Sequence, residues 1–366
     1  GLGLNIMAVG GFARYMDHIG ASKALVKLTI KPLLALRSPY LVMAGTWVLG
    51  MFLGLAINSA SGLAMLLMVT AFPILVSLGV SRLSAVAVIA TTLCLDWSPS
   101  DTGTILAATT AGIDPVNYWV QYQIPIASVV IPVVACLHYF TQKWMDQRDG
   151  HVVTASALVQ PVSKDGEVEK MPPLYYAILP VIPLALILIF SDLMIASIKM
   201  DIIKAMFIGM AIGMIIEFVR LRDGKKVLGD IQVFFDGLGM QMANVITLIV
   251  AGETFAKGLV AIGTIDNIIT SAQTSGFGAV GMILVMITII AVCSIIMGSG
   301  NAPFFAFAAL TPTVAAKMSV APVVMLLPMH LAASSARAMS PITAVIVVAS
   351  SMGNVSPFDV VKRTAI

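Results

Sequence analysis

The chain has 366 residues, of which 59% are hydrophobic and 11% charged, and its mean hydropathy is +0.99. A soluble domain carries roughly a quarter charged residues, so this composition excludes one and predicts an all-α polytopic membrane protein in a lipid bilayer. The net charge of +3 comes without a basic cluster, which argues against nucleic acid as a partner. Cys94, Cys136 and Cys293 lie in apolar runs without metal-ligand spacing, so neither a disulfide, a metal nor an organic cofactor is expected.

The first predicted elements are a membrane span, a basic loop and a hairpin. Residues 1–20 predict the span, and the loop from residue 21 to residue 37 contains four basic and no acidic residues, which places it in the cytoplasm by the positive-inside rule. Leu41–Ile57 and Leu63–Val76 flank Asn58-Ser59-Ala60-Ser61-Gly62, and each is short for a span of about 20 residues. We therefore expect a re-entrant hairpin with these polar residues at its tip.

A broken helix and a polar segment complete the first half. Leu83–Ala111 is apolar except for Leu95-Asp96-Trp97-Ser98-Pro99-Ser100-Asp101-Thr102-Gly103, which predicts a discontinuous helix. Pro125–Phe140 predicts a span that returns to the cytoplasm. Residues 143–173 form the longest polar stretch and predict a cytoplasmic linker between a first repeat, 1–142, and a second repeat, 174–366.

The second half follows the same order of elements. The loop 264–277 contains no lysine or arginine and is expected outside the membrane. Before this loop, spans are expected at Leu174–Phe190, Ile202–Val219 and 239–262; after it come a second hairpin at 279–316 with its tip at 298–303, and a second discontinuous helix at 321–352 with its break at 334–341.

Matches at a fixed spacing indicate that the two halves are related. Asn58 lies 243 residues before Asn301, and Phe12-Ala13-Arg14 lies 243 residues before Phe255-Ala256-Lys257. The loop after the first element is basic and its counterpart in the second half is not, so the repeats are expected to be inverted. The same spacing predicts that about two helices are missing at the front of the chain and about one at its end.

Polar breaks at matched positions predict one substrate site near the middle of the membrane. A helix that ends there presents unpaired backbone amide groups and the positive end of its dipole, which suit a carboxylate. The alternative is that serines in membrane helices bond only to their own or neighbouring helices. The candidate substrate-binding residues are Asn58, Ser59, Ser61, Ser98, Ser100, Thr102, Ser299, Gly300, Asn301, Ser334, Ser335, Arg337 and Ser340.

Arg337 is the most informative single residue, because an arginine inside the membrane costs about 2.5–3.5 kcal/mol and is a functional candidate by default. We expect it to hold a substrate carboxylate bidentately. The alternative is a structural ion pair with Asp96 or Asp101. Those two aspartates are candidates for coupling to Na⁺ or H⁺, and equally for simple pairing with Arg337.

The second hairpin tip, the second break and the end of the chain resemble the anaerobic C4-dicarboxylate carrier family of the DcuC type. The resemblance rests on Gly298-Ser299-Gly300-Asn301-Ala302-Pro303-Phe304, on Arg337 with Ser340-Pro341, and on Ser356-Pro357-Phe358-Asp359-Val360-Val361-Lys362-Arg363-Thr364. It implies two inverted repeats, each with a scaffold part and a hairpin-bearing transport part, that work as an elevator in the cytoplasmic (inner) membrane. It also implies succinate, fumarate or malate as substrate. The first break, with Asp96 and Asp101, is more acidic than expected for that family.

The leading hypothesis is therefore a secondary transporter, not an enzyme, that moves C4-dicarboxylates by symport or exchange, with a homodimer through the scaffold helices as a conceivable assembly. One alternative is a cation/proton antiporter or a carrier of another organic anion that uses the two aspartates. A remote alternative is an intramembrane hydrolase with Ser299 as nucleophile and His330 as base, or with Asp96 and Asp101 as a dyad. The first tip has no histidine partner, which favours a symmetric binding site over a catalytic one.

Four other ionisable residues are interpreted as structural. Asp17, His18 and Glu253 lie close to predicted helix ends or on faces that can contact water. His330 lies in an apolar helix and is expected to be a core histidine with its hydrogen bonds satisfied.

Overall fold

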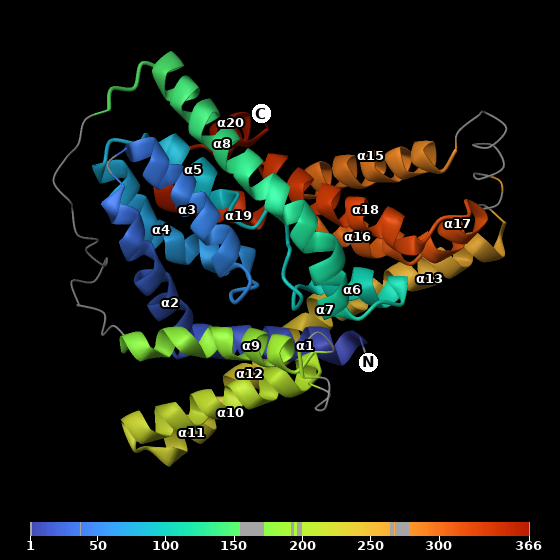
Figure 1. The fold of residues 1–366 in the computed structure, drawn as a ribbon, viewed down its shortest axis with the longest axis horizontal. Helices are drawn as coiled ribbons and strands as arrows, with labels where there is room; N and C mark the ends of the chain where they lie inside the picture. Colours follow the sequence, from blue (N-terminus) through green and yellow to red (C-terminus); the bar gives the residue numbers. More distant parts are fainter. Residues whose placement is uncertain are drawn as a thin grey trace.

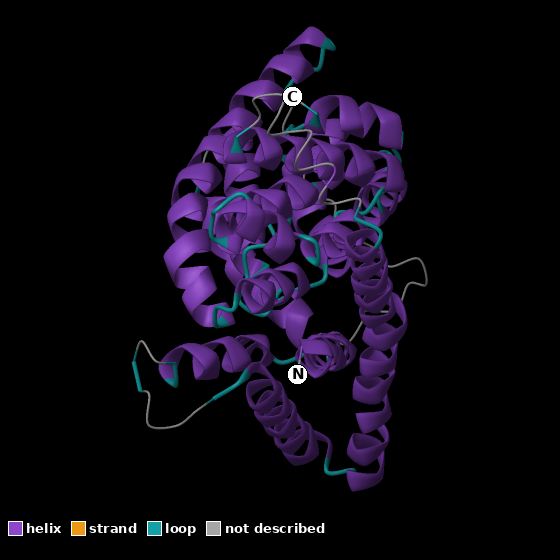
Figure 2. Cartoon of the chain, turned by 90° about the vertical axis from the view of Figure 1, so that its right-hand side faces the viewer, coloured by secondary structure: helices purple, strands orange, loops and turns teal. Residues whose placement is uncertain are grey.

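The computed structural model describes residues 2–36, 38–153, 172–191, 194–195, 200–263, 267 and 278–365. Over these residues the chain is helical and contains no β-strand (Figure 1, Figure 2). The predicted all-α class is therefore confirmed. Arg37, residues 154–171 of the expected linker and nearly all of the expected outer loop 264–277 lie outside the described residues. The sides of the membrane assigned to these segments stay predictions.

The first half contains both predicted interruptions of the helical backbone, whereas the re-entrant path of the hairpin stays a prediction, because its second leg, Ala60–Ser77, is long and apolar enough to cross a membrane. No helix covers residues 54–59 or 91–101, so both polar stretches interrupt the backbone where expected. The helices are α1 (Leu2–His18), α2 (Ala21–Ile30), α3 (Pro39–Leu53), α4 (Ala60–Ser77), α5 (Arg82–Ala90), α6 (Thr102–Ala111), α7 (Pro115–Tyr118) and α8 (Ile124–Arg148), with a 3-10 helix at Lys31–Ala35 and a π-helical turn at Trp119–Gln123.

One predicted element of the first half is wrong. The expected basic loop after the first span is helix α2 with the following 3-10 helix. The reason is an apolar face at helical spacing, because Ala21, Leu25 and Ile30 are buried while the lysines lie between them. Helix α8 also continues to Arg148, so the polar segment after it begins later than residue 143.

The second half contains the two corresponding interruptions, and here too the re-entrant path stays a prediction, because the first leg, Ala279–Met297, is long and apolar enough to cross a membrane. Gly298 ends helix α15 in the left-handed conformation (φ 65°), and Asn301 begins α16. Ser334 and Ser335 still belong to α18, so the break begins at Arg337 rather than at residue 334. The elements are a 3-10 helix at Leu174–Val181, α9 (Ile182–Ile189), α10 (Ile202–Leu221), α11 (Gly224–Gly229), α12 (Ile231–Gln241), a π-helical turn at Met242–Ile246, α13 (Thr247–Ala261), α15 (Ala279–Met297), α16 (Asn301–Ala308), α17 (Thr311–Lys317), α18 (Pro322–Ala336), a 3-10 turn at Arg337–Met339, α19 (Ala344–Gly353) and α20 (Pro357–Thr364).

Helices from both halves pack together in two groups (Figure 1). In the first, which we call the lower group, α1 packs against α10 and α12, and α9 packs against α10. In the second, the upper group, α6 packs between α16 and α18, while α4 and α5 pack against α19 and α20 packs against α5. The two sequence halves are therefore interleaved in space. Because α1 also contacts α6, the polar breaks of the upper group lie beside the lower group.

Glycines let α1 and α12 cross at close range. A Cβ atom added at Gly237 of α12 would lie 2.7 Å from the carbonyl oxygen of Gly10 and 2.8 Å from the Cα of Gly11. Small residues at such a crossing bring two backbones together, which is a common way of packing helices in membranes. The lower group is therefore built around a tight helix pair.

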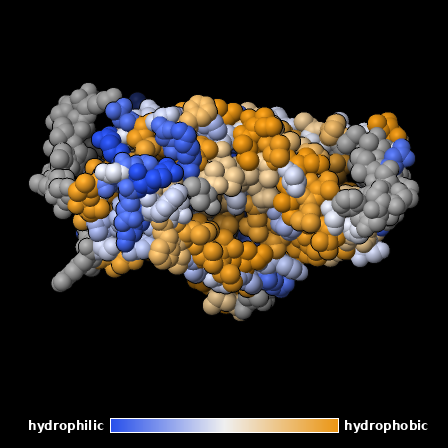
Figure 3. Space-filling view, turned by 90° about the horizontal axis from the view of Figure 1, so that it is seen from above, coloured by the Kyte–Doolittle hydropathy of each residue, from blue (hydrophilic) through white to orange (hydrophobic). Residues whose placement is uncertain are grey.

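Apolar side chains cover much of the surface. Among the described residues, six helical segments are long and apolar enough to cross a membrane. One face of α8 exposes Val129, Val133, Leu137 and Phe140, each between 51% and 66% exposed. Figure 3 shows apolar side chains over the middle of one face and hydrophilic ones gathered toward one end. Such a surface needs lipid around it, so the chain is a multi-pass membrane protein.

Candidate functional site

A cavity of about 340 Å³ lies where the lower and upper groups meet. The lower group contributes one wall from α1 and α12, and the upper group contributes the ends of α4, α6 and α16 with the second break. The lining residues are Val9, Gly10, Ala13, Arg14, Asp17, Asn58, Ser59, Ala60, Asp96, Asp101, Thr102, Gly237, Met240, Gln241, Val245, Asn301 and Arg337. Polar groups from both hairpins and both broken helices therefore face one space.

Seven of the sequence-predicted site residues line this cavity, and they come from all four interrupted segments: Asn58, Ser59, Asp96, Asp101, Thr102, Asn301 and Arg337. The other candidates lie outside its lining: Ser61, Ser98, Ser100, Ser299, Gly300, Ser334, Ser335 and Ser340. Several of these bond to the protein instead. Ser98 donates to the carbonyl of Leu55 (3.2 Å), and Ser335 donates to that of Cys94 (3.2 Å). These serines hold the broken helices in place, as the alternative hypothesis predicts for serines in membrane helices.

Arg337 bridges the two broken helices. One of its terminal nitrogens (Nη2) donates to Oδ1 of Asp96 at 2.7 Å and to the carbonyl of Leu93 at 2.5 Å. The Arg337 side chain is 15% exposed and that of Asp96 is 9% exposed. The ion pair with Asp96, which the sequence left as an alternative to substrate binding, is therefore present, and it stands at the cavity wall.

Asp101 is occupied by its own helix. Its Oδ2 accepts hydrogen bonds from the backbone amides of Gly103 (2.8 Å) and Thr104 (3.1 Å). A carboxylate at this position satisfies the free amide groups at the start of α6 and complements the helix dipole. The start of α6 is therefore already filled by a protein carboxylate and does not offer free amides to a substrate.

His330 differs from its predicted role in one respect. It is only 1% exposed, but neither ring nitrogen has a hydrogen-bond partner among the described residues. Its Nε2 lies 3.5 Å from Oδ2 of Asp101, which makes an ion pair if the ring is protonated, and the ring stacks on Phe304 at 4.9 Å between centroids. His330 is therefore a core histidine, as expected, but the expectation that its hydrogen bonds are satisfied is wrong. The ring is held by packing, since a Cβ at Gly103 would lie 2.2 Å from Nε2.

The two hairpin tips present amides and a helix start to the cavity. Asn58 donates from Nδ2 to Oγ of Ser100 at 3.0 Å, and its Oδ1 has no partner among the described residues. Ser59 caps α4 by accepting from the amide of Gly62 at 3.1 Å. Asn301 is the first residue of α16. Both tips therefore combine an asparagine side chain with the positive end of a helix.

Sequence reasoning missed the wall formed by α1 and α12. Arg14, Asp17 and Gln241 line the cavity, whereas the sequence predicts a structural role for Asp17 and no place in the site for the other two. A signal for Arg14 was present, because it belongs to one of the segments that recur in the second half, as Lys257. Lys257 itself is not among the residues that line the cavity, so this match points to one wall only, whereas both matched asparagines line the cavity.

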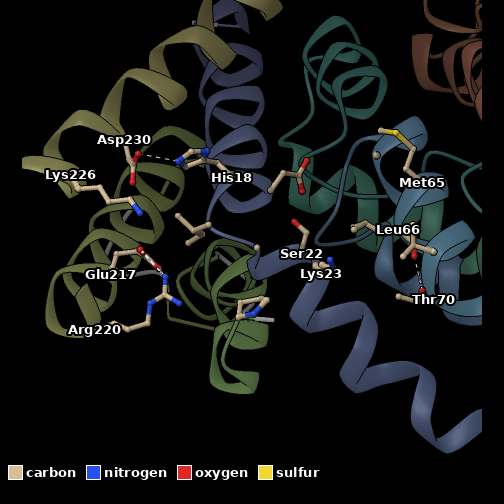
Figure 4. Close-up of a pocket in the computed structure, with 16 residues that line it drawn as sticks. His18, Ser22, Lys23, Met65, Leu66, Thr70, Glu217, Arg220, Lys226 and Asp230 are labelled. Atoms are coloured by element: carbon tan, nitrogen blue, oxygen red, sulfur yellow. Dashed lines mark hydrogen bonds and ion pairs between the residues drawn. The ribbon is translucent and has the colours of Figure 1, made fainter. Parts of the chain in front are cut away.

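A larger cavity of about 660 Å³ adjoins this site (Figure 4). On one side it is lined by α10 to α12, where His18 pairs with Asp230 (3.0 Å) and Arg220 pairs with Glu217 (2.9 Å). On the other side lie Ser22, Lys23 and residues of α4, including Met65, Leu66 and Thr70. Asp17 lines both cavities. The two spaces therefore meet at the end of α1.

This arrangement defines a class of protein, a helical membrane carrier, because an apolar surface encloses a polar cavity built from helix breaks and one arginine. A family model described as C4-dicarboxylate anaerobic carrier (DcuC) matches residues 1–366. The chain belongs to this family, as the resemblance predicted.

Named relatives agree with this assignment. The chain is 35% identical over 367 residues to the probable anaerobic C4-dicarboxylate transporter DcuC of Vibrio cholerae, covering 100% of this chain and 78% of that protein. It is 36% identical over 365 residues to the anaerobic C4-dicarboxylate transporter DcuC of Escherichia coli K12, covering 100% and 77%. A putative uncharacterized transporter of Haemophilus influenzae is 32% identical over 201 residues, 52% of this chain and 67% of that protein. The chain is thus a transporter of the inner membrane and not an enzyme.

Proposed function

We propose that this chain moves succinate, fumarate and malate across the cytoplasmic membrane, by symport with H⁺ or Na⁺ or by exchange. The observation that carries the proposal is the 340 Å³ cavity, in which Arg337, Asn58 and Asn301 face one space. Its volume is near the lower end of the roughly 300–1,000 Å³ typical of ligand sites, which suits a small dianion. The relatives' names point to the same substrate class.

Each end of the substrate has chemically suitable partners. Arg337 offers a guanidinium, whose planar fork matches a carboxylate better than an ammonium group does. The starts of α4 and α16 offer amide groups and dipole ends beside the side chains of Asn58 and Asn301. Two carboxylates joined by a short carbon chain would thus be held at both ends, which favours a C4-dicarboxylate over a monocarboxylate.

The placement of the cavity supports an elevator with two inverted repeats. One wall belongs to the tight α1–α12 pair and the other to the hairpin tips and breaks. In the proposed motion the upper group, which carries the substrate, slides along the lower group. The 660 Å³ cavity, whose cations include Lys226 and Arg220, is the proposed aqueous route to the site, and the positive-inside rule assigns its mouth to the cytoplasm.

Counterflow in proteoliposomes tests this function. Vesicles that contain the purified full-length gene product and are loaded with unlabelled succinate should accumulate labelled succinate, fumarate and malate. Monocarboxylates and inorganic phosphate should give no accumulation. Accumulation of another organic anion, or Na⁺/H⁺ exchange without any dicarboxylate flux, would instead establish one of the alternative carriers.

A further inference from the structure

The charges that line the substrate cavity do not suit a dianion as they stand. Two arginines, Arg14 and Arg337, face three aspartates, Asp17, Asp96 and Asp101. With every group ionised, the wall carries one negative charge in excess. A dicarboxylate that enters this space as a dianion meets like charge in a medium that screens it poorly, so one wall carboxylate has to be neutralised for binding to be favourable.

Asp96 is the carboxylate that competes with the substrate for Arg337. Its Oδ1 already occupies Nη2 of Arg337 at 2.7 Å, which is the interaction expected of a substrate carboxylate. Asp101 is bound to the start of α6, and Asp17 lies on the opposite wall. Only Asp96 competes with the substrate for the arginine.

The guanidinium of Arg337 has a second partner besides Asp96, on the same unwound stretch of the chain. Asp96 lies in the unwound stretch 91–101 with a φ of 44°, one of four positive values among the described non-glycine residues. Arg337 is anchored by its bond to the carbonyl of Leu93. The exchange therefore needs only the Asp96 side chain to turn away from Arg337 and Ser334, while the hydrogen bond to Leu93, in the same unwound stretch, keeps the guanidinium at the cavity.

We propose that the Asp96 carboxylate occupies, before substrate binds, the position on Arg337 that a substrate carboxylate takes. Substrate binding then displaces Asp96 from Arg337, and the displaced Asp96 carboxylate binds one proton that arrives through the water in the cavity. The proposal rests on the proposed dicarboxylate transport and deepens it by naming the proton-coupling residue. The other ionisable groups around Asp96 are Asp101, His330 and Cys94. The carboxylate of Asp101 disfavours a negative charge on Asp96 and a protonated His330 favours it. The His330→Gln variant below tests the contribution of His330.

Binding of fumarate to the purified full-length protein tests the exchange, measured by calorimetry from about pH 6.5 to about pH 8.5, where fumarate stays a dianion. In the unaltered protein affinity should fall with rising pH, approaching tenfold per unit when one proton is taken up. In Asp96→Asn the arginine is free, so affinity at the alkaline end should rise at least tenfold and its pH dependence should be lost. Asp359→Asn, an exposed carboxylate of α20, is the matched control and should keep the original slope.

Direct proton counting covers the case in which Asp96→Asn does not fold. A pH indicator should record about one proton taken up per fumarate bound by the unaltered protein at the alkaline end of the range. No proton uptake, or weaker binding by Asp96→Asn with an unchanged slope, overturns the exchange. A slope that survives Asp96→Asn but disappears in His330→Gln moves the proton to His330 and also overturns it. Absence of fumarate binding by the unaltered protein instead refutes the proposed function itself.

Discussion

At the residue scale, the chemistry of the site depends on which protein groups the charged side chains already bond to. Arg337 is paired with Asp96, and Asp101 caps α6. Both aspartates looked alike in the sequence, since each lies in the same polar stretch. Their hydrogen bonds distinguish them. Asp101 caps a helix and so stabilises the fold, whereas Asp96 pairs with the cavity arginine and so changes what Arg337 can bind.

Arg337→Lys should weaken dicarboxylate binding by about one to two orders of magnitude while expression stays normal. Lysine keeps the charge but loses the planar guanidinium, whose Nη2 bonds to both Leu93 and a carboxylate, and a hydrogen bond to a charged group contributes roughly 1.5–3 kcal/mol. Equilibrium binding in detergent is the measurement. Unchanged affinity in Arg337→Ala would show that the arginine serves only the structure.

Asn58→Ala and Asn301→Ala should each weaken binding by about one to two orders of magnitude, for the same energetic reason. Both side chains line one cavity, so the double variant should depart from additivity by more than the ~0.3–0.5 kcal/mol seen for independent sites. A double-mutant cycle on binding measures this. Strict additivity would mean that the two tips do not contact one ligand.

At the scale of elements, two devices hold the helices around the site. One is a buried polar cluster that connects α20 to the upper group. We call it the α20 cluster, and it consists of Arg363, Asp146, Ser84 and Ser81. Arg363 donates to Oδ1 of Asp146 at 2.6 Å and to Ser84 at 2.7 Å, and Asp146 also accepts from Ser81 at 2.6 Å. The other device is the glycine-lined crossing of α1 and α12.

Arg363→Met should destabilise the protein by about 3–5 kcal/mol, because it leaves the fully buried Asp146 without its counter-charge. Thermal unfolding in detergent is the measurement. Lys362→Met removes an exposed pair on the same helix and should change stability little. Equal melting temperatures for the two variants would contradict the role of the α20 cluster.

Gly237→Ala should destabilise the α1–α12 pair, since the new Cβ would lie 2.7 Å from a backbone oxygen that cannot move aside easily. Gly239 is two residues away on the same helix, and a Cβ added there would meet no atom within 4 Å, so Gly239→Ala should be neutral or stabilise by up to about 1 kcal/mol through helix propensity. Thermal unfolding of both variants gives the comparison. A stable Gly237→Ala protein would show that the two helices can separate without cost.

At the scale of the whole molecule, two adjoining cavities suggest a route from one side of the membrane to the site. The larger one lies between α4 and the α10–α12 helices (Figure 4), and Asp17 lines both the larger and the smaller cavity. A carrier open to one side is the state expected when one route is wide and continuous. The assigned side follows from the basic residues near its mouth.

Val69→Cys, in a background without the native cysteines, should react with a membrane-impermeant thiol reagent added from the cytoplasmic side. Val69 lines the larger cavity and is 40% exposed. Val86→Cys should stay unreactive, because Val86 is fully buried. Labelling in inside-out and right-side-out vesicles distinguishes the sides, and reaction from the outside alone would reverse the assigned topology.

The sequence by itself determined the membrane class, the family resemblance and the four polar interruptions of the helical backbone. These features are local, because apolar runs and the glycine, proline and asparagine residues that interrupt them decide backbone structure over a few residues. Helix α2 was predicted as a loop, because its lysines lie between the residues of an apolar face that is recognised only from its packing.

Only the tertiary structure decided which side chains share a site. It joined Arg337 to Asp96 across 241 positions of the chain, placed Arg14 and Gln241 of the lower group on the cavity wall, and left seven serines and Gly300 among the candidates outside the cavity. Whether a hydroxyl faces a cavity or a neighbouring carbonyl depends on how distant helices pack. No spacing along the chain encodes that choice, because the packing energy belongs to pairs of helices rather than to either one.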